Sequence, residues 1–226
     1  MLMKERSRSL NLVSSGDTEV IRDRHILDSL AVVPILQGNE KIIDIGTGAG
    51  FPGLPVKIWY PDTHVILVES RMKRAEFLMD AVVALGIENC EVLNQRVEMV
   101  AHIPEYRGHF DVALARAVAN LSVLWEYMLP LLKIGGVAVA YKSRGIIQEI
   151  KDSEVCLEIL GGQLEDTVEY VAADYKGLLV VARKVRPCPE EYPRLPGRAE
   201  KRPIGLRAKP QKGARFAFWV QINGPH

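Results

Sequence analysis

Residues 41–53 read Lys-Ile-Ile-Asp-Ile-Gly-Thr-Gly-Ala-Gly-Phe-Pro-Gly, and this stretch decides the fold. Its first five residues form a short, mostly β-branched run, which predicts a buried strand. Gly46, Gly48 and Gly50 follow at once and allow the backbone to turn tightly and to approach a ligand closely. A helix that begins directly after such a loop offers unpaired N–H groups to a nucleotide-like ligand.

Strand-like and helix-like segments alternate along the rest of the chain. Strands are expected at 41–45, 64–68, 91–94, 110–115 and 137–141, and helices at 71–85, 121–132 and 145–160, with Gly86, Gly135-Gly136 and Gly161-Gly162 as helix terminators. This alternation predicts an α/β fold with a parallel sheet. Two further strands, 163–171 and 178–185, are joined by 172–177 without a helix, which predicts an antiparallel edge.

The chain divides into three predicted parts. Residues 1–39 form an N-terminal helical segment, because 17–36 carries apolar residues at helical spacing. Residues 40–185 form the main domain. Residues 186–226 form a basic, proline-rich arm whose prolines exclude regular helix and central strand, so an extended arm is expected.

Charge is unevenly distributed along the chain. The formal net charge is only +1, but residues 183–215 hold 11 Lys or Arg against three Glu. This segment is therefore strongly basic and the remainder acidic. A basic segment of this kind favours a polyanionic partner, because Lys and Arg displace counterions from phosphates. A solvated tail that only maintains solubility explains the charge equally well.

Composition restricts the compartment and the type of site. Cys90, Cys156 and Cys188 lie far apart, which argues against a zinc ribbon or a disulfide framework and fits a reducing compartment. The five histidines show no metal-ligand spacing, so no metal is expected. No apolar stretch is long enough to cross a bilayer, and we expect a cytoplasmic protein without a membrane partner.

The glycine loop alone does not separate two cofactor classes, because residues 48–53 also satisfy the dinucleotide fingerprint. Asp44 stands two residues before Gly46, at the expected end of the strand. A carboxylate there repels the pyrophosphate of NAD and favours the positive charges of S-adenosylmethionine. Glu69 ends the next strand, where an acid binds ribose hydroxyls in both classes.

Residues 96–98, Arg-Val-Glu, follow the third strand on the same edge of the sheet, where we expect the adenine to bind. The Glu98 carboxylate or the backbone of Val97 and Glu98 would recognise the adenine amine, and Glu98 could instead be an acid favoured at a helix start. No Tyr-x-x-x-Lys pair occurs, which weakens the alternative hypothesis of a nicotinamide-dependent reductase. A noncatalytic RNA-binding factor remains a third hypothesis.

Several further blocks stand in a fixed order along the chain. They are Arg24-His25-Ile26-Leu27-Asp28-Ser29-Leu30, the loop of 44–53, Lys73-Arg74, Phe110-Asp111-Val112, Arg116-Ala117, Leu131-Leu132-Lys133, Tyr192-Pro193-Arg194, Pro196-Gly197 and Lys201-Arg202-Pro203. Together they resemble the bacterial ribosomal RNA small-subunit methyltransferase G family, also called glucose-inhibited division protein B, over residues 11–204. Residues 206–226 have no counterpart in that resemblance.

The resemblance implies a doubly wound, mostly parallel seven-stranded sheet with an N-terminal helical extension. It also implies methylation of N7 of one guanine in 16S ribosomal RNA, in free RNA or in the assembled small subunit, with S-adenosylmethionine as cofactor. The cofactor residues expected from the loop and the resemblance are Asp44, Gly46, Gly48, Gly50, Phe51, Glu69, Ser70, Arg71, Val97, Glu98 and Arg116. N7 already has a free lone pair, so no general base is expected.

Basic residues outside the loop are the candidate RNA contacts, although each could equally be a solvated charge. They are Lys73, Arg74, Lys142, Arg144, Arg194, Lys201 and Arg202. Arg116 is expected to orient the cofactor or a phosphate through its planar guanidinium. His25 and Asp28 share one helical face and either lie near the cofactor or stabilise the packed helix; the structural role is favoured.

Overall fold

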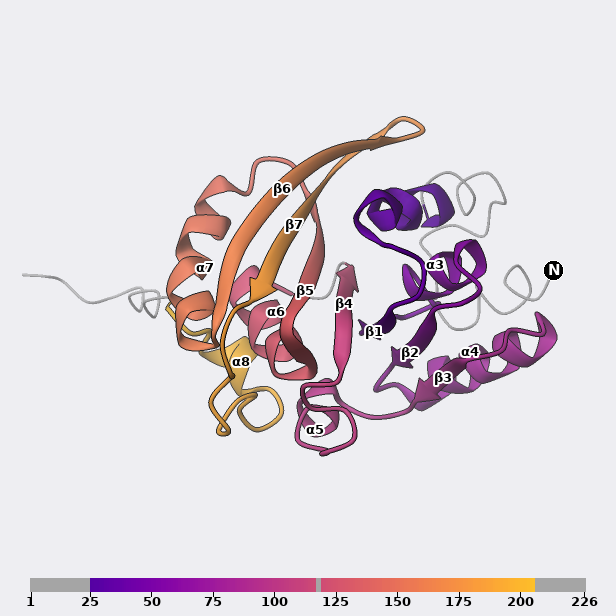
Figure 1. Ribbon diagram of the computed structural model, residues 1–226, viewed down its shortest axis with the longest axis horizontal. Coiled ribbons are helices and arrows are strands. Elements are labelled where there is room, and N and C mark those ends of the chain that lie inside the picture. The colour runs from indigo at the N-terminus through magenta and orange to yellow at the C-terminus, as the bar shows by residue number, and fades with distance from the viewer. Residues whose placement is uncertain (1–24, 117–118, 206–226) are drawn as a thin grey trace, which may run out of the picture.

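A single mixed sheet organises the molecule. The computed structural model describes residues 25–116 and 119–205, and its seven strands run in the order β3-β2-β1-β4-β5-β7-β6 (Figure 1). The first five strands in chain order are parallel, whereas β7 is antiparallel to both β5 and β6. The prediction of an α/β fold with a mostly parallel, doubly wound sheet is confirmed.

The observed elements follow the predicted order. The strands are β1 (Lys41–Ile45), β2 (His64–Val68), β3 (Cys90–Leu93), β4 (Phe110–Arg116), β5 (Leu132–Ser143), β6 (Gly162–Ala172) and β7 (Tyr175–Lys184). The α-helices are α3 (Gly53–Trp59), α4 (Met72–Ala84), α5 (Val97–Val100), α6 (Leu121–Met128), α7 (Ile147–Ile159) and α8 (Arg198–Lys201), with 3-10 turns η2 (Leu30–Ile35) and η3 (Leu129–Leu131).

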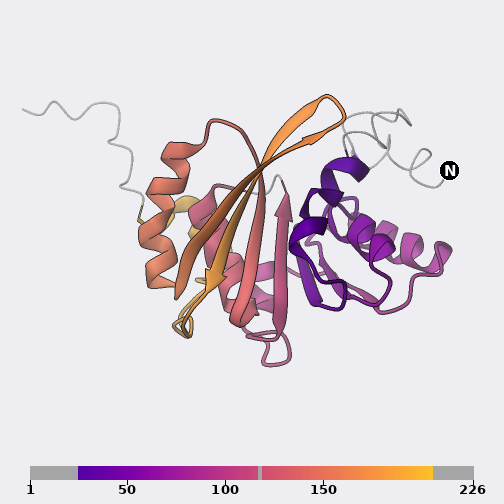
Figure 2. The ribbon, with the colours of Figure 1, turned by 45° about the horizontal axis from the view of Figure 1, so that its top comes forward.

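Helices cover both faces of the sheet (Figure 2). Successive residues of β1 point to opposite faces, so Ile42 belongs to one buried cluster and Ile43 to the other. The turn η2 and helices α3 and α4 cover the Ile42 face, while α5, α6, α7 and α8 cover the Ile43 face. This double burial explains why β1 is almost continuously apolar.

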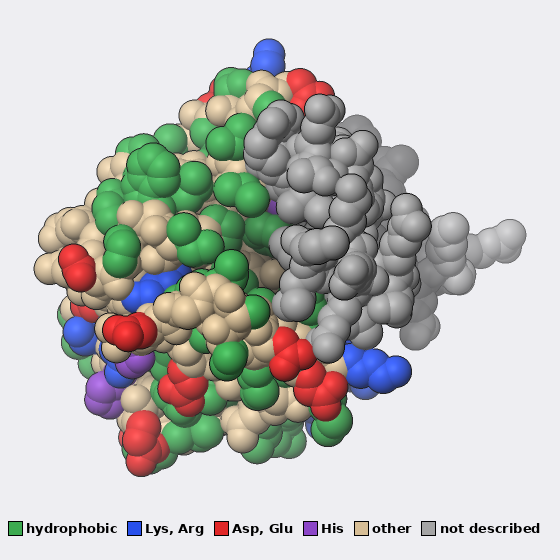
Figure 3. Space-filling view, turned by 90° about the vertical axis from the view of Figure 1, so that its right-hand side faces the viewer, with side chains coloured by type: hydrophobic (Ala, Val, Ile, Leu, Met, Phe, Trp, Pro, Cys, Tyr) green, Lys and Arg blue, Asp and Glu red, His purple; other side chains and the backbone are tan. Residues whose placement is uncertain are grey.

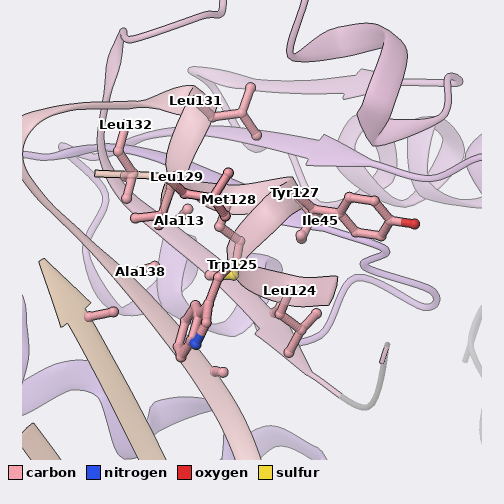
Figure 4. Close-up of a cluster of buried hydrophobic side chains, with 14 of the residues drawn as sticks. Ile45, Ala113, Leu124, Trp125, Tyr127, Met128, Leu129, Leu131, Leu132 and Ala138 are labelled. Carbon is pink, nitrogen blue, oxygen red and sulfur yellow. The ribbon is translucent and has the colours of Figure 1, made fainter. Parts of the chain in front are cut away.

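Helix α6 forms the centre of the larger cluster (Figure 4). All eight of its residues are buried. The Trp125 side chain is fully buried, and its indole N–H donates to Ser153 Oγ on α7 at 3.1 Å. The same helix carries a fully buried carboxylate, Glu126, whose partner lies in the basic arm.

Three local expectations were wrong. Gly135 and Gly136 do not end a helix but lie inside β5, where Gly135 has a φ of +89° and the register to β4 shifts. Strands β6 and β7 continue into the expected loop 172–177 and leave only a tight turn, in which Ala173 has a φ of +53°. The arm was expected to be extended throughout but contains a short helix, α8. This helix is possible because no proline occurs between Pro196 and Pro203.

The N-terminal prediction is only partly within the described residues. The helix expected at 17–36 is helical from residue 25 and ends in η2, with Pro34 inside the 3-10 turn. Residues 17–24 lie outside the described ranges. Within those ranges no helix is long and apolar enough to cross a membrane, and no cluster of three metal-ligating side chains occurs. The three-part division of the chain stays a prediction.

Candidate cofactor and substrate site

The glycine loop joins the carboxyl end of β1 to α3 at the centre of the sheet. Gly46 and Gly48 have φ values of +64° and +62°, a region that L side chains rarely adopt. Gly53 is required for space, because a Cβ there would lie 2.4 Å from Leu67 Cδ2 and 2.9 Å from Asp44 Oδ2. The loop thus brings backbone against the strand ends, as the sequence predicted.

Asp44 lies beneath this loop and is fully buried. Its Oδ2 accepts hydrogen bonds from Thr47 Oγ1 at 2.5 Å and from the Gly53 N–H at 2.8 Å. Its Oδ1 is buried and has no hydrogen-bond partner among the described residues. Burial raises the pKa of Asp44 to about 7, opposed by the two hydrogen bonds and by the charge of Arg116. Oδ1 is therefore a buried acceptor whose hydrogen-bonding capacity the described residues leave unused.

Glu69, at the end of β2, is buried and braces the same loop. Its two oxygens accept from the Gly48 N–H at 3.2 Å and from the Arg71 N–H at 2.8 Å. A carboxylate has about four acceptor positions, so two remain for ligand hydroxyls. Glu69, the predicted ribose-binding acid, therefore also stabilises the loop, a role that its position in the sequence did not indicate.

A polar cavity opens at the carboxyl ends of β1, β2 and β3. Its lining consists of Ile45, Gly46, Val68, Ser70, Gln95, Arg96, Val97, Glu98, Tyr127 and Glu200. Four of the predicted cofactor residues, Gly46, Ser70, Val97 and Glu98, are thus brought together. Residues from three strand ends with a buried open carboxylate nearby fit a cofactor that carries both hydroxyl and ammonium groups.

Glu98 lies at the start of α5 and is buried, with 3% exposure. Its Oε1 accepts from Tyr127 Oη at 3.3 Å and from the Gly197 N–H at 3.0 Å, and Arg96 lies 3.6 Å away. One oxygen therefore holds groups from α6 and the arm. The role of Glu98 toward adenine stays a prediction.

Arg116 ends β4 and lies in a network with the N-terminal segment. Its NH1 donates to Asp28 Oδ2 at 2.9 Å and to the His25 carbonyl at 3.2 Å, and its guanidinium lies 5.1 Å from the centre of the Phe51 ring. Tyr170 Oη donates to the other Asp28 oxygen. Arg116 is thus positioned beside the glycine loop by an ion pair with Asp28, and the choice between the two expected roles of Asp28 stays a prediction.

A second cavity, of about 650 Å³, lies over α3 and α4. It is lined entirely by apolar residues, among them Phe51, Trp59 and Phe77. Figure 3 shows this side of the molecule, where hydrophobic side chains gather. A cofactor with charged ends would lose hydration there without gaining polar partners, so the polar cavity is the better candidate site.

The candidate RNA contacts fall into two groups. Lys142 donates to Glu149 Oε1 at 2.5 Å, Arg144 pairs with Glu169, and Arg194 pairs with Glu126, so these three are engaged within the protein. Lys73, Lys201 and Arg202 have exposed side chains. Arg74 is partly buried beside the glycine loop, with NH1 3.9 Å from where a Gly48 Cβ would lie. RNA contact by any of them stays a prediction.

The side chains of the site that were not predicted include Tyr127, Glu126 and Glu200. Glu126 is a lone acid in an otherwise apolar helix, and that isolation was the available signal for a buried ion pair. Tyr127 and Glu200 come from elements distant in sequence from the loop, so local spacing held no signal for them.

The strand order with antiparallel β7, joined to an acidic glycine loop, defines a methyltransferase of the doubly wound α/β class. The structure of TrmN from Thermus thermophilus is similar at a TM-score of 0.55 and 18% identity, over 70% of this chain and 48% of that chain. M. jannaschii TYW2 in complex with AdoMet is similar at a TM-score of 0.56 and 17% identity, over 70% and 74%. These likenesses concern the fold alone.

Sequence comparison is more specific. The family model described as rRNA small subunit methyltransferase G matches residues 1–176. Proteins named "Ribosomal RNA small subunit methyltransferase G" are 40% identical over 206 residues in Acetivibrio thermocellus and 41% identical over 207 residues in Clostridium novyi, covering 90% of this chain and 85% of each relative. The chain belongs to the rRNA small subunit methyltransferase G family, and it is a methyltransferase.

Proposed function

We propose that this enzyme transfers the methyl group of S-adenosylmethionine to N7 of a guanine in small-subunit ribosomal RNA. The observation that carries the proposal is the buried Asp44 carboxylate, whose Oδ1 has no partner among the described residues. A pyrophosphate placed over that carboxylate would be repelled, whereas the cationic end of S-adenosylmethionine would be attracted. Family membership and the polar cavity support the same ligand.

When bound, S-adenosylmethionine supplies an electrophilic methyl group on a sulfonium. Asp44 would hold the ammonium group, Glu69 the ribose hydroxyls, and the cavity around Gly46 and Val97 the adenine. The protein need not remove a proton, because N7 of guanine attacks with an existing lone pair. Its contribution is to align the two reactants, and Arg116, held by Asp28, is a positioning residue for that alignment.

The product identifies the reaction. Small subunits or 16S RNA lacking the modification, incubated with the enzyme and S-adenosylmethionine, are expected to acquire 7-methylguanosine, measured by nucleoside mass spectrometry. Parallel reactions with naked RNA, small subunits and whole ribosomes identify the assembly state that serves as substrate. Methylation of another base or atom, or none in any of the three under conditions that support cofactor binding, would contradict the proposal.

Cofactor binding is expected to release protons near neutral pH. Because burial raises the pKa of Asp44 to about 7, part of the free enzyme has this group protonated at pH 7. An ammonium group favours the ionised carboxylate, so ligand binding lowers the pKa of Asp44. Affinity for S-adenosylhomocysteine should therefore rise between about pH 6 and pH 8, by at most about tenfold per pH unit.

Calorimetry in two buffers of different ionisation enthalpy measures this proton release directly. The Asp44→Asn variant lacks the titrating group and is the matched control, so its binding should be weaker and nearly independent of buffer. Equal proton release by the wild type and this variant would assign the linkage to another group.

A further inference from the structure

The basic arm does not extend away from the body but is anchored beneath α6. Glu126 Oε1 accepts from both the backbone N–H and the Nε of Arg194, each at 2.9 Å, and Oε2 accepts from NH2 at 2.6 Å. Glu126 is fully buried. A bidentate pair with one partner inside the core is geometrically specific, so it fixes the position of the arm.

Carbonyl groups of the arm supply a second set of anchors. Arg107 donates to the carbonyl oxygens of Tyr192 at 2.7 Å and Pro189 at 3.0 Å. His102 Nε2 lies 2.7 Å from the carbonyl oxygen of Pro193. These contacts fix the backbone path itself, because each acceptor belongs to the main chain.

The anchored arm then reaches the polar cavity. The Gly197 N–H donates to Glu98 Oε1 at 3.0 Å, and Ala199 is buried at 1% exposure. Helix α8 places Glu200 in the cavity lining together with Gly46, Ser70 and Val97. The pKa of Tyr127 is raised by burial and then by the charges of Glu98 and Glu200.

The two acids of the cavity, Glu98 and Glu200, differ in the hydrogen bonds that they already accept. Glu98 already holds Tyr127 and Gly197. Glu200 is exposed and accepts no hydrogen bond from residues 25–116 or 119–205. A free carboxylate that lines this cavity is a suitable acceptor for the exocyclic amine of an adenine bound there.

We propose that α8 forms a wall of the cofactor pocket and that Glu200 accepts a hydrogen bond from the adenine 6-amino group, with Glu126 and Arg194 as the pair that positions the wall. The inference rests on the proposed cofactor. It assigns to the arm a task separate from RNA contact, because the side chain involved is acidic and faces the cavity.

Binding of two ligands to the full chain tests the contact. The probes are S-adenosylhomocysteine and S-inosylhomocysteine, in which a carbonyl oxygen replaces the 6-amino group. Glu200→Ala is expected to weaken S-adenosylhomocysteine about tenfold, the effect of one hydrogen bond to a charged group, and to change S-inosylhomocysteine much less. Glu190→Gln removes an exposed acid from the same arm, outside the cavity lining, and should leave both affinities unchanged.

Limited trypsin digestion gives a readout of the wall itself. Arg198 and Lys201 are exposed cleavage positions in α8, whereas Arg202 precedes Pro203 and is not cleaved. S-adenosylhomocysteine should slow cleavage at these positions in the wild type and protect Glu200→Ala less at equal occupancy, as mapped by mass spectrometry. Arg194→Gln should speed cleavage and weaken ligand binding, although its side chain does not line the cavity.

The outcomes separate this inference from the proposed function. If the wild type fails to bind S-adenosylhomocysteine, the proposed cofactor is wrong. If the wild type binds and Glu200→Ala binds equally well, or loses affinity equally for both ligands, the amine contact is overturned while the cofactor stands. If the ligand does not change the cleavage of the arm, the proposal that α8 forms a wall of the pocket is overturned.

Discussion

Replacing Asp44 by asparagine is expected to weaken S-adenosylhomocysteine binding about 10- to 100-fold, and methyl transfer at low cofactor concentration by a similar factor. The carboxylate is the buried anion whose Oδ1 lacks a partner among the described residues. Asparagine has nearly the same shape and keeps one oxygen for the Gly53 N–H and Thr47 Oγ1, so the loop should keep its path. The loss therefore reports the charge.

The same substitution should not lower the folding stability above neutral pH, although it weakens ligand binding. The folded-state pKa of Asp44, raised by burial to about 7, lies above its ordinary value of 3.8. The stability linked to this group is therefore fully present below about pH 4 and is lost as pH rises through about 7. Asparagine carries no charge to bury, so its free energy of unfolding above neutral pH should equal or exceed that of the wild type.

Asp111→Asn is the matched control for this pair of effects. Asp111 lies near the start of β4, at the edge of the sheet opposite the glycine loop, and accepts from the Lys41 N–H and from Lys133 Nζ, both at 2.9 Å. Burial raises its pKa, but these hydrogen bonds and charges outweigh that effect, and the net pKa is lowered. Above about pH 4 this variant should be less stable than the wild type, because it lacks the ionised carboxylate that these contacts stabilise, and it should retain ligand binding. A stable Asp44→Asn protein with wild-type affinity would remove Asp44 from the cofactor site.

The parts of the fold that depend on local chemistry could be predicted from the sequence. The five residues of β1 have the apolar pattern of a buried strand. The glycines after them have the conformational freedom that a tight loop requires. Their predicted bounds and those of β2 agree with the observed strands. Gly135 misled the prediction because a glycine at positive φ serves equally at a helix end and at an irregular position within a strand.

The site could be predicted only in part, because its acids act across long sequence separations. Asp44 was expected to attract a cation, but two of its contacts within the fold are to Thr47 and Gly53, which were not anticipated. Glu126 and Arg194 are 68 positions apart. The prolines of the arm determine its local conformation but not its docking, so nothing near Glu200 indicated that it would line the cavity.

Replacing Trp125 by alanine is expected to destabilise the protein by about 3–5 kcal/mol, a large share of the 5–15 kcal/mol typical of a domain. The indole is fully buried between the sheet and α7, and its N–H donates to Ser153 Oγ at 3.1 Å. Removal leaves a cavity among side chains that are themselves fully buried, including Leu121 and Leu124. Surrounding strands restrict relaxation, so the cavity cannot close fully.

Urea unfolding followed by circular dichroism measures the change, with Trp125→Phe and Trp59→Ala as controls. Phenylalanine retains most of the buried ring and loses the Ser153 hydrogen bond, so a smaller loss of about 1–3 kcal/mol is expected. Trp59 is 56% exposed, and its replacement should cost less than about 1 kcal/mol. Equal midpoints for Trp125→Ala and Trp59→Ala would contradict the assignment of Trp125 to the core.

The Trp125 variant also distinguishes the core from the site it supports. Neighbouring Glu126 and Tyr127 contact the arm and Glu98 from the same helix, so a loosened α6 should displace the wall of the cofactor pocket. At a temperature where Trp125→Ala is still folded, its affinity for S-adenosylhomocysteine should fall, and trypsin should cleave the arm faster. Asp44→Asn should lower the affinity without faster cleavage of the arm in the absence of ligand, because the charge of Asp44 acts directly on the cofactor. Trp125 instead acts on the cofactor pocket through α6 and the arm.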